Sequence, residues 1–130
     1  MRQLSPILAS RPRKRSVLEN RAAEIAMILI DLDDLLIKTT GSAALMPQAK
    51  LLMGLLIHGS MQMKDALMYT PLSYRAFYVM ITKLKTLGLI QSDGVEGDRR
   101  IRRLKLGRRA APIIKLLAES REALVEKVKA

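Results

Sequence analysis

The residues whose types and spacing most clearly indicate chemistry are seven basic side chains between Arg99 and Arg109, a stretch that contains no acidic residue. Like charges held this close repel one another, so the arrangement is costly unless a polyanion neutralises it. Phosphates along a nucleic acid backbone are such a partner. We therefore predict that Arg99, Arg100, Arg102 and Arg103 bind nucleic acid; the alternative is a strongly basic, solvated hairpin.

The composition of the whole chain agrees with a polyanionic partner. Its 130 residues carry 23 lysines and arginines against 12 acidic residues, a formal charge of +11, which would suit nucleic acid or an anionic membrane surface. Charges such as Asp31 and Lys50 interrupt the apolar runs before they could span a bilayer. The chain has no cysteine and one histidine, so we expect no disulfide, metal ion or cofactor. We expect a single domain in the cytoplasm, because no secretory signal is recognisable.

Residues 1–15 are predicted to form a flexible arm. They contain two prolines and little apolar surface, which leaves little to offset the entropy lost on ordering. Arg11, Arg13, Lys14 and Arg15 could follow DNA phosphates or enter a minor groove. The alternative is a solvated tail without a binding role.

Two consecutive helices, over residues 61–68 and 73–87, are predicted to form a helix-turn-helix. Ser60 can cap the first helix, and Ser73 can cap the second. On a wheel of about 100° per residue, an apolar stripe from Phe77 to Leu87 separates from a polar side that contains no acidic residue. The polar side begins at the helix N-terminus, where a recognition helix meets base edges in the major groove. The alternative is an ordinary solvated helix face. Tyr74, Arg75 and Tyr78 are predicted to read bases. The predicted DNA-binding residues of this helix are Ser73, Tyr74, Arg75, Tyr78, Thr82 and Lys85.

A hairpin over residues 89–106 follows the second helix directly. Gly88 is expected to end the helix, and two glycines in the turn at residues 93–98 let the chain reverse. A basic hairpin after a recognition helix corresponds to the wing of a winged helix, whose tip can enter an adjacent minor groove. We therefore predict a mainly α fold with a small β-hairpin, a winged helix-turn-helix domain over residues 16–130.

Three further helices are predicted over residues 16–38, 47–57 and 109–128. Ser16 and Glu19 have the spacing of a capping box at the start of the first. The apolar stripe of the last helix is too long for the small core to cover, so we expect it to pack on the first helix and on the same helices of a second subunit. The predicted dimerisation residues are Ile25, Leu29, Leu32, Ile113, Leu116, Leu117, Leu124 and Val125.

The stretch from Tyr74 to Ile90, followed by Asp98-Arg-Arg-Ile-Arg-Arg-Leu-Lys-Leu106, resembles the MarR family of bacterial winged-helix regulators. The wing signature of that family is Asp, any residue, Arg, five residues and Leu-Thr. Asp98, Arg100 and Leu106 fit it, whereas Gly107 stands where the threonine is expected. The resemblance implies a homodimer on a pseudopalindromic operator, with Arg100 in the wing and Asp98 orienting an arginine.

Together these features predict a dimeric regulator that binds double-stranded DNA sequence-specifically and, by the family's usual mode, represses transcription by occupying an operator. A basic winged-helix protein that binds RNA or a ribosome is an alternative. A winged-helix module that docks an acidic protein surface is another. An enzyme is not expected, because the sequence contains no nucleophile motif, no paired carboxylates near a base and no phosphate-binding glycine loop.

Overall fold

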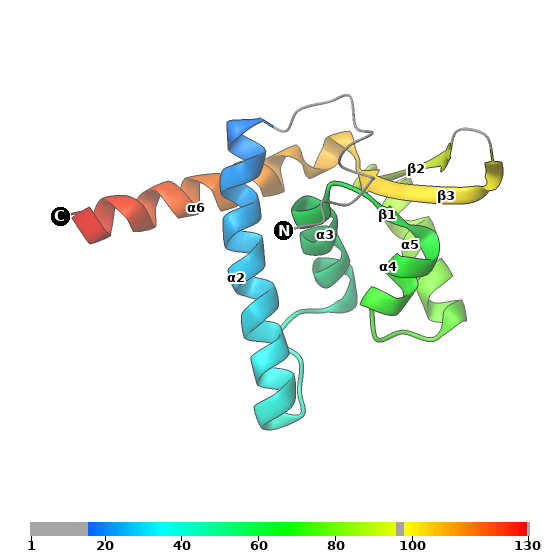
Figure 1. Cartoon of the computed structure of the whole chain (residues 1–130), viewed down its shortest axis with the longest axis horizontal. Helices are drawn as coiled ribbons and strands as arrows, with labels where there is room; N and C mark the ends of the chain where they lie inside the picture. Colours follow the sequence, from blue (N-terminus) through cyan, green and yellow to red (C-terminus); the bar gives the residue numbers. More distant parts are fainter. Residues whose placement is uncertain (1–15, 96–97, 130) are drawn as a thin grey trace.

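The computed structural model describes residues 16–95 and 98–129. Helices form most of the molecule, and a small antiparallel sheet carries a hairpin that projects from the helical body on the side opposite to the C-terminus (Figure 1). The predicted fold class, a mainly α winged helix-turn-helix, is therefore confirmed. The elements are α2 (Val17–Thr40), α3 (Pro47–His58), β1 (Met61–Gln62), α4 (Met63–Tyr69), α5 (Tyr74–Thr86), β2 (Ile90–Val95), β3 (Asp98–Leu106), a 3-10 turn η1 (Arg108–Ala110) and α6 (Ala111–Lys129).

Helix α3 is the centre of the core. Every residue from Leu51 to Leu56 is buried, and the helix packs against α2, α4 and β3. Phe77 from α5 and Leu104 from β3 are fully buried in the same cluster. Burial of a side chain of this size contributes about 1.5–3 kcal/mol. The helix-turn-helix and the wing are therefore fixed to one continuous core.

The sheet differs from the prediction. Residues 61 and 62 were expected to begin a helix capped by Ser60, but they form a third strand in the order β1-β3-β2, with Met61 paired to Leu104. Helix α4 starts at Met63 without a side-chain cap. The Ser60 hydroxyl instead accepts a hydrogen bond from Arg103 Nη1 at 3.2 Å. Pairing with a distant strand and burial of the Met61 side chain outweigh the local capping signal.

The C-terminal end of α5 is fixed by glycine geometry. Gly88 has φ +78°, and the amides of Gly88 and Leu89 donate to Lys85 O and Leu84 O, both at 3.0 Å, which is the Schellman motif. Gly107 packs directly against this turn, because a Cβ there would collide with the carbonyl oxygen of Gly88. The glycine in place of the expected threonine is therefore a requirement of this close approach.

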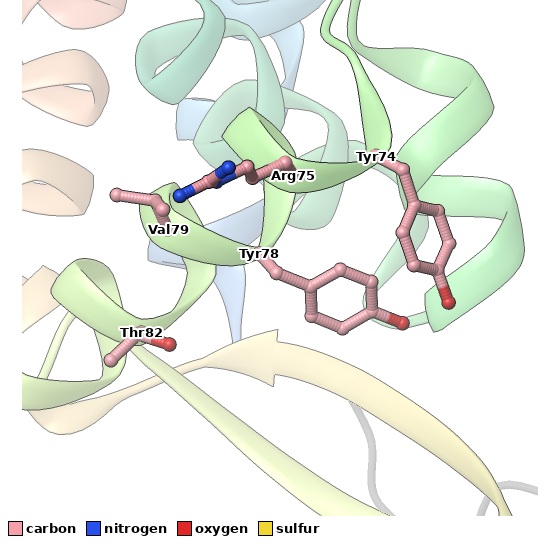
Figure 2. Close-up of a pocket in the computed structure, with 5 residues that line it drawn as sticks. All are labelled: Tyr74, Arg75, Tyr78, Val79 and Thr82. Carbon is pink, nitrogen blue, oxygen red and sulfur yellow. The ribbon is translucent and has the colours of Figure 1, made fainter.

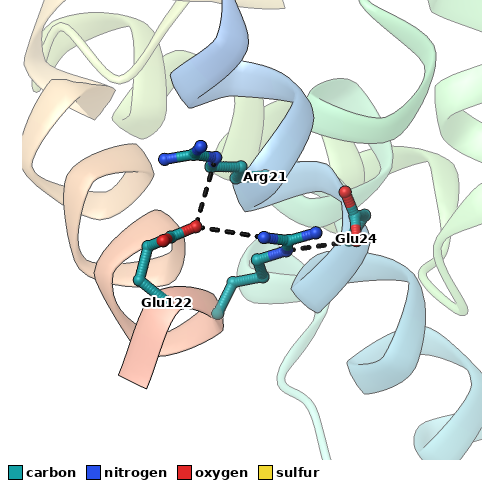
Figure 3. Close-up of polar contacts among 4 residues, drawn as sticks. Arg21, Glu24 and Glu122 are labelled. Carbon is teal, nitrogen blue, oxygen red and sulfur yellow. Dashed lines mark hydrogen bonds and ion pairs between the residues drawn. The ribbon is translucent and has the colours of Figure 1, made fainter. Parts of the chain in front are cut away.

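Helix α6 crosses α2 and continues beyond it to the C-terminus (Figure 1). Buried alanines, Ala22 and Ala26 on α2 and Ala118 on α6, keep the side chains small where the helices are in contact. Figure 3 shows the polar contacts at the crossing, in which Glu122 lies 3.2 Å from Arg21 and Arg121 lies 3.3 Å from Glu24. Such partly exposed pairs contribute little stability, so the apolar packing holds the crossing and the charges favour one register.

A buried carboxylate fixes the connection between α2 and α3. Asp33 is fully buried, and its Oδ1 accepts hydrogen bonds from the amides of Ala44 and Leu45 at 2.7 and 2.8 Å. Its Oδ2 lies 3.4 Å from Lys50 Nζ. Burial raises the pKa of Asp33, but the two amides and the Lys50 ammonium together lower it by more. The resulting pKa is below the ordinary value. The Lys50 ammonium also lies 5.9 Å from the centre of the Tyr69 ring on α4.

Replacing Gly54 by alanine should destabilise the protein by about 1–2 kcal/mol. A Cβ at this position would lie 2.6 Å from Tyr69 Cε2 and 2.7 Å from the end of the Met61 side chain. Overpacking of this kind costs about 1–3 kcal/mol, which exceeds the gain of about 0.5–1 kcal/mol from removing a helical glycine. Urea unfolding followed by circular dichroism measures the difference. An unchanged or higher midpoint would show that the Tyr69 ring can move aside.

Candidate nucleic-acid interface

The N-terminus of α5 is capped and its inner face is anchored. The Ser73 hydroxyl accepts a hydrogen bond from the amide of Ala76 at 3.2 Å, as its position before the helix predicts. Phe77, Ile81 and Leu84 are buried on one side. Because these side chains fix the rotation of the helix about its own axis, they also decide which residues point outward.

The outward face of α5 is centred on a residue that the sequence prediction left out. On a wheel of about 100° per residue, the direction opposite to the buried stripe passes through Val79 and Thr86, with Arg75 and Thr82 beside it. Val79 is 65% exposed. Figure 2 shows the Arg75 side chain extended toward Val79, while the Tyr74 and Tyr78 rings point to the other side. The structure therefore divides the predicted reading face into an outermost strip and a flank.

The two tyrosines form a pair on that flank. Their ring centroids are 4.8 Å apart and their planes meet at 57°. The centroids of the Tyr78 and Phe77 rings are 5.3 Å apart, with the two planes nearly perpendicular. A side-chain hydrogen bond with Tyr74, together with burial, raises the pKa of Tyr78. Tyr78 therefore stays a neutral phenol near pH 7, able to donate or accept a hydrogen bond. The pair lines an open, mostly apolar groove with Arg75, Val79 and Thr82.

No acidic residue lies within α5 or in the turns at its two ends. The sequence has none between Asp65 and Asp93, so the whole of α5 and the turns at both its ends lack negative charge. Lys83 and Lys85 are exposed in the last turn of the helix. A surface of this kind can approach phosphates without like-charge repulsion.

The predicted wing residues occupy different positions in the hairpin. Arg102 is exposed. Arg103 is partly buried and donates to Ser60, so one of its nitrogens already has a partner within the chain. Lys105 pairs with Asp93 of β2 at 3.0 Å. Asp98, Arg99 and Arg100 contribute backbone to the start of β3, next to the hairpin turn. The predicted arm residues Arg11, Arg13, Lys14 and Arg15 lie outside the described residues.

Sequence reasoning did not select several exposed residues beside this site. Val79 and Thr86 were missed because the prediction sorted side chains by type, although their position on the helical wheel would have found them. Arg108 and Arg109 are exposed directly after the wing. They belong to the same basic run, and that run was the available signal.

The predicted dimerisation residues fall into two groups. Leu29, Ile113 and Leu117 pack against the core of their own chain, and Ile25 and Val125 are also partly buried. The remaining three, Leu32, Leu116 and Leu124, are 46%, 63% and 54% exposed.

Among the described residues, neither a candidate membrane span nor a candidate metal site is found. No helix within residues 16–95 and 98–129 is long and apolar enough to cross a bilayer. Over the same residues, no group of three or more histidine and acidic side chains is placed to hold a metal ion.

Several solved structures share this arrangement of elements. A transcriptional regulator from Thermotoga maritima superposes with a TM-score of 0.55 at 18% identity, over 85% of this chain and 76% of that one. A MepR-like protein in complex with pseudoligands gives 0.50 at 19% identity, over 85% and 77%. A mutant MarR from E. coli gives 0.50 at 14% identity, over 91% and 100%. No family model and no curated protein matches the sequence. The chain has the winged helix-turn-helix fold of the MarR-type transcriptional regulators.

Proposed function

We propose that the protein is a dimeric, MarR-like transcriptional regulator that binds double-stranded DNA sequence-specifically and represses transcription by occupying its operator. The observation that carries the proposal is the outward face of α5, which is capped, anchored on the core and free of acidic residues beside a basic hairpin. A similar fold in a transcriptional regulator from Thermotoga maritima supports it.

The proposed mechanism assigns sequence specificity to α5 and general affinity for DNA to the wing and the net charge. The first turns of α5 enter the major groove, where Arg75 forms paired hydrogen bonds with a guanine edge. Arg100 and Arg102 of the wing meet phosphates or the neighbouring minor groove, with Asp98 orienting an arginine. The formal charge of +11 adds a long-range attraction for DNA of any sequence. Blocking of promoter access then follows from occupancy alone.

Selection of bound sites from a random duplex pool at a stated salt concentration tests the proposal. A two-fold dimer places two recognition helices on successive major grooves, so the selected sites should be palindromic with half-site centres about one helical turn apart. A pool without a preferred sequence, or stronger binding to structured RNA than to duplex in direct competition, would contradict the proposal.

The salt dependence of binding should report the phosphate contacts of the wing. Affinity for duplex should fall steeply between about 50 and 200 mM salt, and Arg100→Ala or Arg102→Ala should each reduce the log–log slope by about 0.9. Fluorescence anisotropy titrations at four or more salt concentrations measure this slope. Lys115→Ala is the matched control, because Lys115 is exposed on α6, outside the proposed interface. Equal slopes for the wing and control variants would exclude the wing from phosphate binding.

The C-terminal part of α6 should contact α2 of the second subunit in the dimer. Leu124 and Val128 continue the stripe of Leu117 at steps of seven and eleven residues, but they are 54% and 84% exposed. The C-terminal part of α6 extends past α2 (Figure 1). Exposed apolar strips of this kind are covered in a symmetric dimer.

Leu124→Lys should therefore convert the dimer to a monomer at micromolar concentration, since it places a charge in the apolar contact. Sedimentation equilibrium measures the mass. Glu119→Lys introduces the same charge on the other side of α6 and should leave the dimer intact. A wild-type protein that sediments as a monomer would argue against this contact.

A further inference from the structure

Val79 is an apolar residue placed at the outermost line of a surface proposed to bind DNA. It is 65% exposed and does not pack against the core. Its neighbours on the same strip are Arg75 one turn before it and Thr82 one turn after it, and all three line one open groove (Figure 2). An exposed valine on its own needs no explanation, but one at the centre of a recognition helix is the side chain that approaches the base edges first.

The major groove offers one apolar feature among its hydrogen-bonding groups. Adenine, guanine and cytosine present donors and acceptors there, whereas thymine also presents its C5 methyl group. A branched aliphatic side chain has no hydrogen bond to offer, so that methyl group is its favourable contact. We propose that Val79 reads thymine through the C5 methyl group, an inference that rests on the proposed function and names the base preference of the same site.

The spacing within α5 places this thymine relative to the base pair that Arg75 contacts. The two residues are four positions apart, about 6 Å along the helix axis, and successive base pairs are about 3.4 Å apart. The thymine therefore lies within about two base pairs of the guanine read by Arg75. Selected sites should contain a thymine at this fixed distance from a guanine in each half-site.

The tyrosine pair does not provide the same contact. Figure 2 shows the Tyr74 and Tyr78 rings on the flank of the helix, directed away from Val79. Thr82 is the competing source of an apolar contact, because its side chain carries a methyl group on the same strip. A test must therefore separate Val79 from Thr82.

Replacing single thymines of a selected site by uracil removes the C5 methyl and leaves every hydrogen-bonding group in place. We expect the substitution to weaken wild-type binding about fourfold at one position in each half-site, the effect of one buried methyl, and to have no effect elsewhere. In Val79→Ala the thymine and uracil duplexes should bind with equal affinity. Fluorescence anisotropy at fixed salt measures the ratio.

Thr82→Ser is the matched control, because it removes one methyl, keeps the hydroxyl and should retain the preference for thymine at that position. Equal binding of thymine and uracil by the wild type would overturn the inference while leaving sequence-specific binding intact. Loss of the preference in Thr82→Ser but not in Val79→Ala would assign the contact to Thr82 and overturn it too. A chain that selects no sequence at all would instead contradict the proposed function. Thermal melting should be unchanged in both variants, since both residues are exposed.

Discussion

Asp33→Ala should lower the free energy of unfolding by about 3 kcal/mol, at the lower end of the cost of removing one partner from a buried ion pair. The carboxylate is fully buried and holds the amides of Ala44 and Leu45. Its removal also leaves the Lys50 ammonium, whose side chain is 15% exposed, without its nearest anion. Urea unfolding at pH 7 followed by circular dichroism measures the loss.

Asp34→Asn is the matched control for this prediction. Asp34 is the next residue along α2 and its carboxylate lies 3.8 Å from the same ammonium, but its side chain is 55% exposed. Exposed pairs of this kind contribute about 0–1 kcal/mol, so the control should change stability far less. Similar losses for the two variants would mean that burial of Asp33 does not decide the effect.

The same carboxylate predicts how stability depends on pH. The pKa of Asp33 in the folded protein lies below its ordinary value, so between that pKa and the unfolded value of about 3.9 the unfolded chain binds more protons. The stability from Asp33 is therefore fully present above about pH 5 and is lost as pH falls through the folded pKa. The difference between wild type and Asp33→Asn should be constant from pH 5 to 8 and shrink below about pH 4. A difference that grows on acidification would reverse the assigned sign.

The sequence predicted the elements better than the long-range contacts. Periodicity in the helices and the glycines around the hairpin are local signals, and they were sufficient for a winged helix-turn-helix. Strand β1 was not predictable in this way, because two residues show no alternation and Met61 becomes a strand only through its pairing with Leu104. The contact of Arg103 was unpredictable for the same reason, because its hydrogen-bond partner Ser60 directly precedes that strand.

The burial of Asp33 is a second feature that the sequence could not predict. In the sequence it interrupts an apolar stripe and looks like a solvent-facing acid, because buried carboxylates are rare unless paired. Its partners lie 11 and 12 residues further along, at the amides of Ala44 and Leu45. Only the folded α2–α3 connection brings them together. The outward direction of Val79 could have been predicted from the sequence, because it follows from the position of the buried stripe on α5 alone.

Arg75→Ala should weaken binding to the selected operator by about 10- to 100-fold, corresponding to about 1–3 kcal/mol for a bidentate base contact. Arg75 lies in the first turn of α5 with its side chain exposed on the outermost strip (Figure 2). Binding to a scrambled duplex should fall much less, because that binding depends on phosphates. The measured quantity is the ratio of the two dissociation constants at one salt concentration.

Two further variants distinguish contacts with base edges from the general effect of positive charge on DNA affinity. Arg75→Lys keeps the positive charge but not the planar pair of donors, so it should retain affinity for the scrambled duplex and still lose most of the specificity ratio. Lys85→Ala removes an exposed charge from the last turn of the same helix and should weaken both duplexes alike. If Arg75→Ala also weakened both alike, Arg75 would contact phosphate. Base reading would then have to come from Val79 and Thr82, further along the same strip of α5, or from Tyr78 on its flank.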